Sequence, residues 1–461
     1  MQYISTRGDA PILNFEEAML TGLARDGGLY VPAELPFWTP GEIAALAGQS
    51  YEDVAFRVML PFVQGTFTEA ELKVAIAKAY ASFAHPARAP LRQIGANHFL
   101  LELFHGPTLA FKDFAMQLIG QLFQTALARS GKRITIVGAT SGDTGSAAIE
   151  AFKGLSNVDV FILFPHGRVS DVQRRQMTTP VDANVHALAL HGTFDDCQNR
   201  LKDMFNDHAF RDEVALAGVN SINFARCLAQ VVYYFTAAVS LGAPDRRVSF
   251  TVPTGNFGDI YAGHLARSMG LPIEDLIIAT NQNDILHRTL TTGEHVLGEV
   301  QPSMSPSMDI QISSNFERAL FDLLDRDAGA VRNLMGDLKT KGGYTLPQGL
   351  QTHLREKFKS GRTSEAETSE TIRQAYAETE ELICPHTAVG VHVAAHHQSA
   401  TPMVTLATAH PAKFQDAVFR ATGKAPVLPA RLADKLSGPE RVTEVQNDLA
   451  ALQALVRKAR A

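Results

Sequence analysis

Strand-like apolar runs alternate with helix-like segments through most of this chain, and this alternation is the feature that most constrains its fold. Buried strands are predicted at residues 133–138, 158–164, 185–190, 248–252, 276–280 and 403–407. Helical patterns lie between several of them, at residues 113–128, 146–152 and 194–206. Strands separated by helices form mainly parallel sheets. We therefore predict an α/β protein, and the length of 461 residues leaves room for more than one sheet.

The two ends of the chain and one internal stretch differ from the alternating region. Residues 1–98 have a mostly helical pattern and are predicted to form an accessory amino-terminal region. Residues 99–430 form the predicted main α/β region, with a smaller α/β subdomain around residues 113–230 and a polar, peripheral insertion at residues 329–369. Residues 431–461 are predicted to form a helical extension laid on the surface. The leucines at helical spacing in this extension are Leu449, Leu452 and Leu455.

Composition excludes several classes of protein. The formal net charge is -6, so the chain lacks the overall basic field that attracts nucleic acid. Cys197, Cys227 and Cys384 lie far apart, which indicates neither a disulfide framework nor a cysteine-rich zinc site. The amino terminus lacks the apolar core of a signal peptide, and no run of about twenty apolar residues offers a membrane span. We expect a cytoplasmic globular protein without a nucleic-acid or membrane partner, and we predict no metal site.

One lysine lies in unusually apolar company, within the stretch FHGPTLAFKDF at residues 104–114. A Gly-Pro-Thr turn precedes Lys112, and a helix-compatible stretch follows it. Partial loss of water around Lys112 would favour its neutral amine, which is the form that attacks an aldehyde to make a Schiff base. The alternative for a single lysine is that its stem covers apolar surface while its charge reaches water.

Two glycine-containing loops follow predicted strands, where ligands gather in parallel α/β folds. The first is GATSGDTG at residues 138–145, and the second is PTGNFGD at residues 253–259. In each, small residues allow backbone N–H groups to converge on an anion at the start of a helix. Two such anion-binding loops beside one desolvated lysine would suit a phosphorylated aldehyde cofactor and the carboxylate of an amino acid.

Competing catalytic signatures are missing from the sequence. There is no Gly-x4-Gly-Lys-Ser/Thr motif, no Gly-x-Ser-x-Gly motif and no His-Glu-x-x-His motif. A P-loop nucleotide hydrolase, an elbow serine hydrolase and a zinc protease therefore lose support.

Four motifs together resemble the threonine synthase family, whose members are pyridoxal-phosphate enzymes of fold type II. They are HGPTLAFKDF at residues 105–114, TSGDTG at 140–145, NSIN at 220–223 followed by Arg226, and PTGNFGD at 253–259. STRG at residues 5–8 and DGGLYVP at 26–32 extend the resemblance over nearly the whole chain. The resemblance implies two α/β domains of the tryptophan synthase β-like type, with pyridoxal 5'-phosphate as the cofactor.

The resemblance also implies a role for individual residues. Lys112 would form the Schiff base with the cofactor, Thr408 would meet the pyridine nitrogen, and Asp143 would lie close to the cofactor's ring oxygen. The residues implied to bind the cofactor phosphate through backbone amides are Gly255, Asn256, Phe257 and Gly258. The other members of the Asp143 loop, implied to hold the substrate carboxylate, are Ser141, Gly142 and Thr144.

The reaction implied by the resemblance converts O-phospho-L-homoserine and water to L-threonine and phosphate, by γ-elimination followed by addition of water at Cβ. The substrate phosphate then needs a cationic pocket of its own. Arg226 is the first candidate, because a guanidinium group binds phosphate through two parallel hydrogen bonds. Arg7 and Lys413 are further candidates.

Two alternatives stay open at this point. Another fold type II lyase, such as a serine/threonine dehydratase, would use the same lysine and loops on an unphosphorylated hydroxy amino acid. A non-catalytic relative would keep the cofactor and turn nothing over. Release of phosphate from O-phospho-L-homoserine separates these readings. We expect a monomer or a homodimer.

Overall fold

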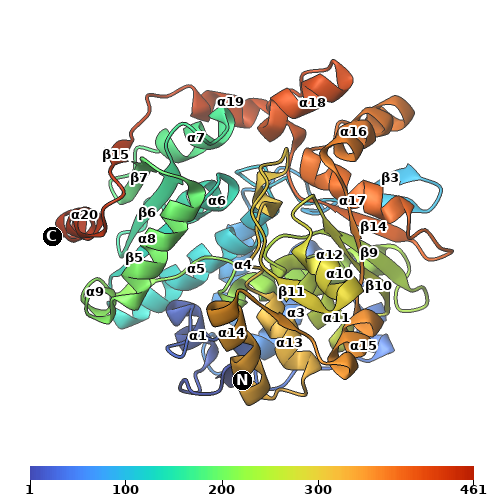
Figure 1. The fold of residues 1–461 in the computed structure, drawn as a ribbon, viewed down its shortest axis with the longest axis horizontal. Coiled ribbons are helices and arrows are strands. Elements are labelled where there is room, and N and C mark those ends of the chain that lie inside the picture. The colour runs from blue at the N-terminus through green and yellow to red at the C-terminus, as the bar shows by residue number, and fades with distance from the viewer. Residues whose placement is uncertain (461) are drawn as a thin grey trace.

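The computed structural model describes residues 1–460 and contains two main sheets that lie side by side (Figure 1). The larger sheet has six strands, in the spatial order β13 (Lys359–Arg362), β10 (Ile273–Thr280), β9 (Val248–Pro253), β14 (Met403–Ala407), β4 (His98–Glu102) and β3 (Leu91–Gly95). The smaller sheet has five strands, in the order β15 (Thr443–Val445), β7 (Val185–Leu190), β6 (Val158–Pro165), β5 (Ile134–Ala139) and β8 (Leu216–Ala217). Every neighbouring pair in these sheets is parallel except β3 and β4. The predicted α/β architecture with mainly parallel sheets is confirmed.

Helices cover both faces of the larger sheet, as the side-chain alternation of its strands requires. In β10, Leu276 and Ile278 belong to the main core with α10 (Phe224–Ser240) and α11 (Gly258–Ser268). The intervening Ile277 and Ala279 pack instead with α17 (Pro385–Ala395). Strands buried on both faces read as continuous apolar runs, which is why the sequence signals them clearly.

The smaller sheet is covered in the same way. In β6, Val160 and Ile162 belong to the core that includes α5 (Lys112–Ser130) and α6 (Asp143–Phe152). The alternate residues Phe161 and Leu163 pack against α8 (Phe194–Asn206) and α20 (Leu449–Arg460). The predicted surface helix of the carboxyl-terminal extension is therefore α20, with Leu452 buried against the smaller sheet.

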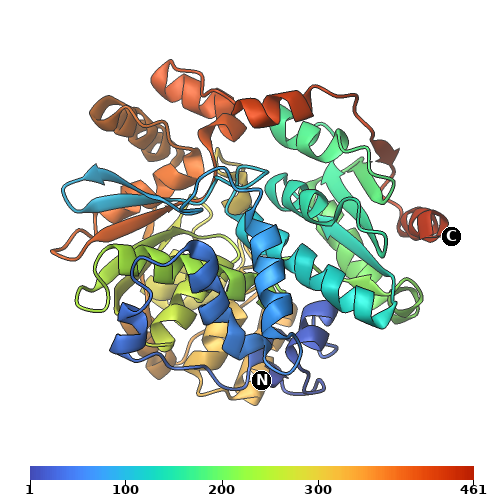
Figure 2. The ribbon, with the colours of Figure 1, turned by 180° about the vertical axis from the view of Figure 1, so that it is seen from behind.

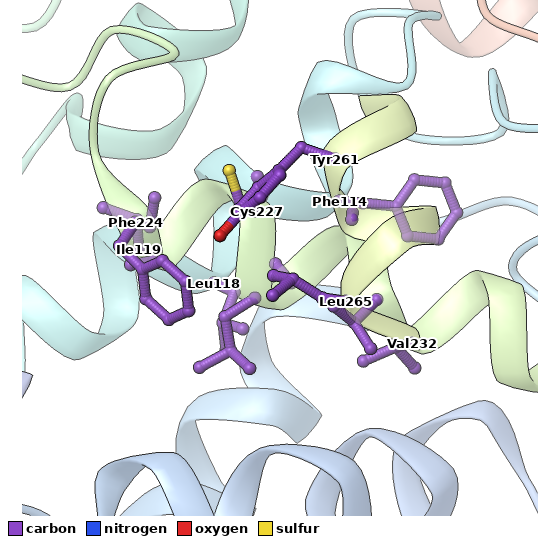
Figure 3. Packing of buried hydrophobic residues seen from close by; sticks show 14 of the residues in the cluster. Phe114, Leu118, Ile119, Phe224, Cys227, Val232, Tyr261 and Leu265 are labelled. Carbon is purple, nitrogen blue, oxygen red and sulfur yellow. The ribbon is translucent and has the colours of Figure 1, made fainter. Parts of the chain in front are cut away.

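The main core continues from one sheet to the other through three helices. Figure 3 shows apolar side chains of α5, α10 and α11 that meet in this core, including Phe114, Leu118, Phe224 and Leu265. Each fully buried side chain of this size contributes about 1.5–3 kcal/mol. Since α5 begins at Lys112, this packing fixes the position of the lysine.

The amino-terminal region packs against α5 and α10 on the face of the molecule that Figure 2 shows. Its strands β1 (Tyr3–Ser5) and β2 (Tyr30–Pro32) pair antiparallel, and its helices are α1 (Phe15–Thr21), α2 (Pro40–Ala44), α3 (Tyr51–Val63) and α4 (Glu69–Tyr80). Helix α4 packs on α5, and α3 packs on α10. The amino-terminal region therefore packs on the helices that join the two sheets.

The remaining elements connect or flank the two sheets. Near the smaller sheet lie α7 (Asp171–Thr178), α9 (His208–Glu213) and α19 (Ala430–Leu436). The others are α12 (Ile285–Thr292), β11 (Glu294–Val296), η1 (Pro306–Met308), α13 (Phe316–Leu323), α14 (Ala328–Lys341), β12 (Gly343–Thr345), α15 (Gln348–Lys357), α16 (Glu365–Thr379), η2 (Pro411–Phe414) and α18 (Gln415–Thr422). The carboxyl-terminal segment, red in Figures 1 and 2, crosses from the larger sheet to the smaller one.

The structure corrects part of the sequence analysis. The prediction of a peripheral insertion at residues 329–369 is wrong for β13, because this strand forms the edge of the larger sheet beside β10. Helix α6 begins at Asp143 rather than at residue 146, so Asp143 and Thr144 belong to its first turn. Strand β15 was not predicted. The domain boundaries at residues 98 and 430 stay predictions.

No helix within residues 1–460 is long and apolar enough to cross a membrane.

The contact between α5 and α6 gives a test of this packing. A Cβ atom at Gly120 in α5 would lie 2.5 Å from the carbonyl oxygen of Ala151, whereas one at Gly336 in α14 would meet no heavy atom within 4 Å. We predict that Gly120→Ala lowers the free energy of unfolding by about 1–3 kcal/mol, because the two helices must separate. Gly336→Ala is the matched control, expected to raise that free energy by up to about 1 kcal/mol. Urea unfolding of both variants measures the difference, and equal stabilities would contradict the described contact.

Candidate active site

Lys112 stands at the first position of α5 and is buried, with 8% of its surface exposed. The turn before it is held by Asp113, whose carboxylate accepts hydrogen bonds from Thr108 N at 2.8 Å and Thr108 Oγ1 at 2.7 Å. A Cβ atom at Gly106 would lie 2.4 Å from the Asp113 side chain, so only glycine fits this close approach. Burial lowers the pKa of Lys112, although the charge of Asp143 opposes this shift. The structure thus gives Lys112 the desolvated setting that the sequence predicted.

The β5–α6 loop brings Asp143 next to Lys112. Asp143 Oδ2 lies 3.5 Å from Lys112 Nζ, and Asp143 Oδ1 lies 2.6 Å from Lys413 Nζ. Burial alone would raise the pKa of Asp143, but the charges of Lys413 and Lys112 hold it well below its usual range. Gln173 Nε2 donates a further hydrogen bond to Oδ1 at 2.9 Å. The site therefore contains one buried carboxylate between two ammonium groups.

The same loop offers backbone donors to an anion. Thr140 Oγ1 accepts hydrogen bonds from the N–H groups of Gly142 and Gly145, both at 2.9 Å, and this closes the loop. The N–H groups of Ser141 and Thr144 have no acceptor among the described residues. Both residues line the adjoining cavity. Gly142 has φ of 140°, and a Cβ there would lie 2.3 Å from the Gln173 amide, so glycine is required.

The second predicted loop, residues 253–258, leads from β9 into α11. Phe257 takes a left-handed conformation with φ of 63°, and no side chain caps the helix. The N–H groups of Gly255, Asn256 and Phe257 have no acceptor among the described residues. A Cβ at Gly255 would lie 2.7 Å from the carbonyl oxygen of Ser307, so the loop is closely backed. Unpartnered N–H groups at a helix start are what a phosphate group needs.

One cavity of about 700 Å³ joins these parts. It is lined by Lys112, the two loops and Thr408, which follows β14. Free backbone donors, a buried amine and a neutral hydroxyl fit the phosphate, aldehyde and pyridine nitrogen of pyridoxal 5'-phosphate. Of the predicted residues, Gly142, Asp143 and Lys413 do not line the cavity. The described residues contain no group of three or more His, Cys, Asp or Glu side chains placed to hold a metal ion.

The three candidates for an anionic substrate group occupy different surroundings. Arg226, in the first turn of α10, lines the cavity and donates to Val219 O at 3.3 Å, but it forms no ion pair with any described carboxylate. Burial lowers its pKa to about 10. Arg7 also lines the cavity, but it already binds Glu317 at 2.9 Å. Lys413 is directed at Asp143 and does not line the cavity, so its assignment as a phosphate ligand is not supported.

The sequence did not indicate the contacts of two titratable residues that line the cavity, His386 and Asp259, although Asp259 ends the predicted PTGNFGD loop. His386, in the first turn of α17, accepts a hydrogen bond from Ser307 N at 3.3 Å through Nε2, and burial lowers its pKa to about 4. Asp259, in the first turn of α11, accepts from the hydroxyls of Tyr233 at 2.6 Å and Tyr234 at 3.1 Å. No local motif indicates either role, since their partners are distant in sequence.

Comparison with known protein families covers most of the chain. The family described as "Threonine synthase N terminus" matches residues 2–80, and "Threonine synthase, C-terminal" matches residues 387–456. "Pyridoxal-phosphate dependent enzyme" matches residues 84–334, which include Lys112 and both loops.

Individual proteins are similar over the full length. A threonine synthase from Pseudomonas aeruginosa is 54% identical, over 99% of this chain and 98% of its own. A crystal structure of pyridoxal-phosphate-bound threonine synthase from Brucella melitensis is 57% identical, with a TM-score of 0.97 and full coverage of both chains. The yeast threonine synthase structure is 39% identical, with a TM-score of 0.94, and covers 100% of this chain and 98% of that one.

Similarity to a dehydratase is confined to the fold. A threonine deaminase from Solanum lycopersicum is 13% identical, with a TM-score of 0.50, over 88% of this chain and 94% of its own. The comparisons therefore favour the first reading of the sequence over the dehydratase alternative.

The buried carboxyl of Asp259 generates a pH prediction. Burial raises its pKa to about 7, even though the two tyrosine hydroxyls oppose the shift. Between its unfolded pKa and about pH 7 the folded protein keeps a proton that the unfolded chain has lost, so stability falls as the pH rises. Asp259→Asn is expected to remove roughly 2–3 kcal/mol of this decline between about pH 4.5 and 7.

Urea unfolding across that pH range measures the difference. The exposed Asp245→Asn is the matched control and should keep the pH dependence of the unsubstituted protein. If Asp259→Asn leaves the pH dependence of the free energy of unfolding unchanged, the Asp259 carboxyl is ionised in the folded state.

Proposed function

The chain belongs to the threonine synthase family, and we propose that it converts O-phospho-L-homoserine and water to L-threonine and phosphate. It is a pyridoxal-phosphate-dependent enzyme of threonine biosynthesis, with fold type II. The observation that carries the substrate assignment is Arg226, a cavity-lining guanidinium without a carboxylate partner among the described residues. A dehydratase substrate carries no phosphate and would leave this charge unused. The cytoplasm stays the predicted compartment, and a monomer or homodimer the predicted assembly.

We assign the cofactor to the part of the cavity between the larger sheet and α5. The Gly255–Gly258 backbone would bind its phosphate, Thr408 would meet its ring nitrogen, and Asp143 would lie near its ring oxygen. Lys112 would hold it covalently. When bound, pyridoxal phosphate supplies an electron sink for negative charge next to the substrate's Cα atom.

The protein's own residues would perform the remaining tasks. Ser141 and Thr144 offer hydroxyls and free N–H groups to the substrate carboxylate, and this orients the Cα–H bond. The Lys112 amine, with its lowered pKa, is suited to accept the Cα proton and return it later. Arg226 would bind the substrate phosphate until the bond between Cγ and the phosphate oxygen breaks.

The proposed role of Lys112 predicts a large loss of turnover when this lysine is replaced. Replacing Lys112 with Ala removes the group that holds the cofactor and moves the proton, and we expect a fall in kcat of about 1,000-fold or more. The assay follows phosphate and threonine together after addition of O-phospho-L-homoserine to the unsubstituted protein and the variant. Equal release of both products by the unsubstituted protein is expected. Release of ammonia from L-serine without turnover of the phosphorylated substrate would instead support the dehydratase.

Arg226 is tested separately from the chemistry at Lys112. Arg226→Ala should raise KM for O-phospho-L-homoserine by roughly 10- to 100-fold, since a charge-assisted hydrogen bond contributes about 1.5–3 kcal/mol. Arg226→Lys keeps the charge and should lose less. The matched control is Arg457→Ala, which removes an arginine on α20 that pairs with Glu213. An unchanged KM in Arg226→Ala would assign the phosphate to other residues.

A further inference from the structure

Lys413 is a second buried lysine of the site. It lies in η2, the short helix between β14 and α18, and only 1% of its surface is exposed. Its ammonium group is 2.6 Å from Asp143 Oδ1 and donates to Thr108 O at 2.9 Å. Lys413 does not line the cavity, and its contact with the site is made through Asp143.

The charge of Lys413 acts directly on the surroundings of Lys112. Asp143 is shared between the two lysines, with the shorter distance to Lys413. A buried carboxylate stays ionised only when cations or donors compensate for the lost water. The negative charge that reaches Lys112 is therefore partly neutralised. The other titratable groups that interact electrostatically with Lys112 or Asp143 are Arg226, Asp259, His386 and Cys384.

Lys413 also connects three segments that are distant in sequence. Asp143 is the first residue of α6, where the loop after β5 of the smaller sheet ends, and Thr108 belongs to the turn before Lys112. Lys413 itself follows β14 of the larger sheet. The loop that carries Asp143 also carries Ser141 and Thr144, the proposed ligands of the substrate carboxylate. One ammonium group thus joins the carboxylate-binding loop to the turn that positions Lys112.

We propose that Lys413 is a positioning residue of the active site, which fixes Asp143 as an anion beside Lys112 and holds the carboxylate-binding loop against the Lys112 turn. The inference rests on the proposed attachment of the cofactor to Lys112. It assigns Lys413 a task other than binding the substrate phosphate.

The test is the visible absorption of the bound cofactor as the pH is raised, because this absorption reports the protonation of the nitrogen that Lys112 contributes. Lys413→Met removes a positive charge, which leaves Asp143 to act on that nitrogen alone. The spectral transition should therefore move to higher pH, by about one unit or more. KM for O-phospho-L-homoserine should rise about 10-fold or more, since the carboxylate-binding loop loses its tether. Lys413→Arg keeps the charge and should retain most of the original transition.

Two further variants keep the test decisive. Lys413→Gln can still donate to Asp143 and Thr108 without a charge, and it replaces Lys413→Met if that variant does not fold. Lys153→Met is the matched control. Lys153 directly follows α6, the helix that begins at Asp143, and it pairs with Glu150 at 2.8 Å. It does not line the cavity.

The outcomes separate this inference from the proposed function. A folded Lys413→Met or Lys413→Gln protein with an unchanged spectral transition and an unchanged KM would overturn the inference. A lower thermal stability without either change would mean a purely structural lysine, which overturns it as well. If the unsubstituted protein has no cofactor absorption that borohydride abolishes, the proposed function itself fails.

Discussion

The candidate active site is built around a buried carboxylate, Asp143, that is held between two ammonium groups. Loss of water makes an isolated carboxylate unfavourable there, and the charges of Lys413 and Lys112 are the main causes that keep the pKa of Asp143 low. The same two contacts join the smaller sheet, through the loop after β5, to the larger sheet and to the start of α5. Electrostatics and architecture are therefore coupled: the ion pairs form only when both sheets are in place.

Parallel topology explains why the chemical groups meet. The loops after β5 and β9 and the segment after β14 all leave their sheets at carboxyl ends of strands, and two of them lead directly into helices. Free N–H groups gather at these ends, and α5 places Lys112 between them. The amino-terminal helices α3 and α4 do not enter the cavity, but they support α10 and α5 and so hold Arg226 and Lys112 in position.

Local patterns in the sequence predicted the parts of the site that local chemistry determines. β7, β14 and α8 have the predicted bounds, and Lys112, the two loops, Thr408 and Arg226 line one cavity. The pattern failed where distant contacts decide. The sequence offered Lys413 as a phosphate ligand, but the structure pairs it with Asp143. Asp143 is 270 positions away, so no local pattern could indicate this pair. β13 is polar because it is an edge strand, and the burial of His386 and Asp259 depends on residues such as Ser307 and Tyr233.

The most direct test of the central claim is the covalent position of the cofactor. Borohydride reduction of the purified protein, followed by digestion and mass spectrometry of the peptides, locates the lysine that carries the pyridoxyl group. We predict modification of Lys112 alone. Modification of Lys413 in place of Lys112, or of neither lysine in a protein that retains its bound cofactor, would contradict it.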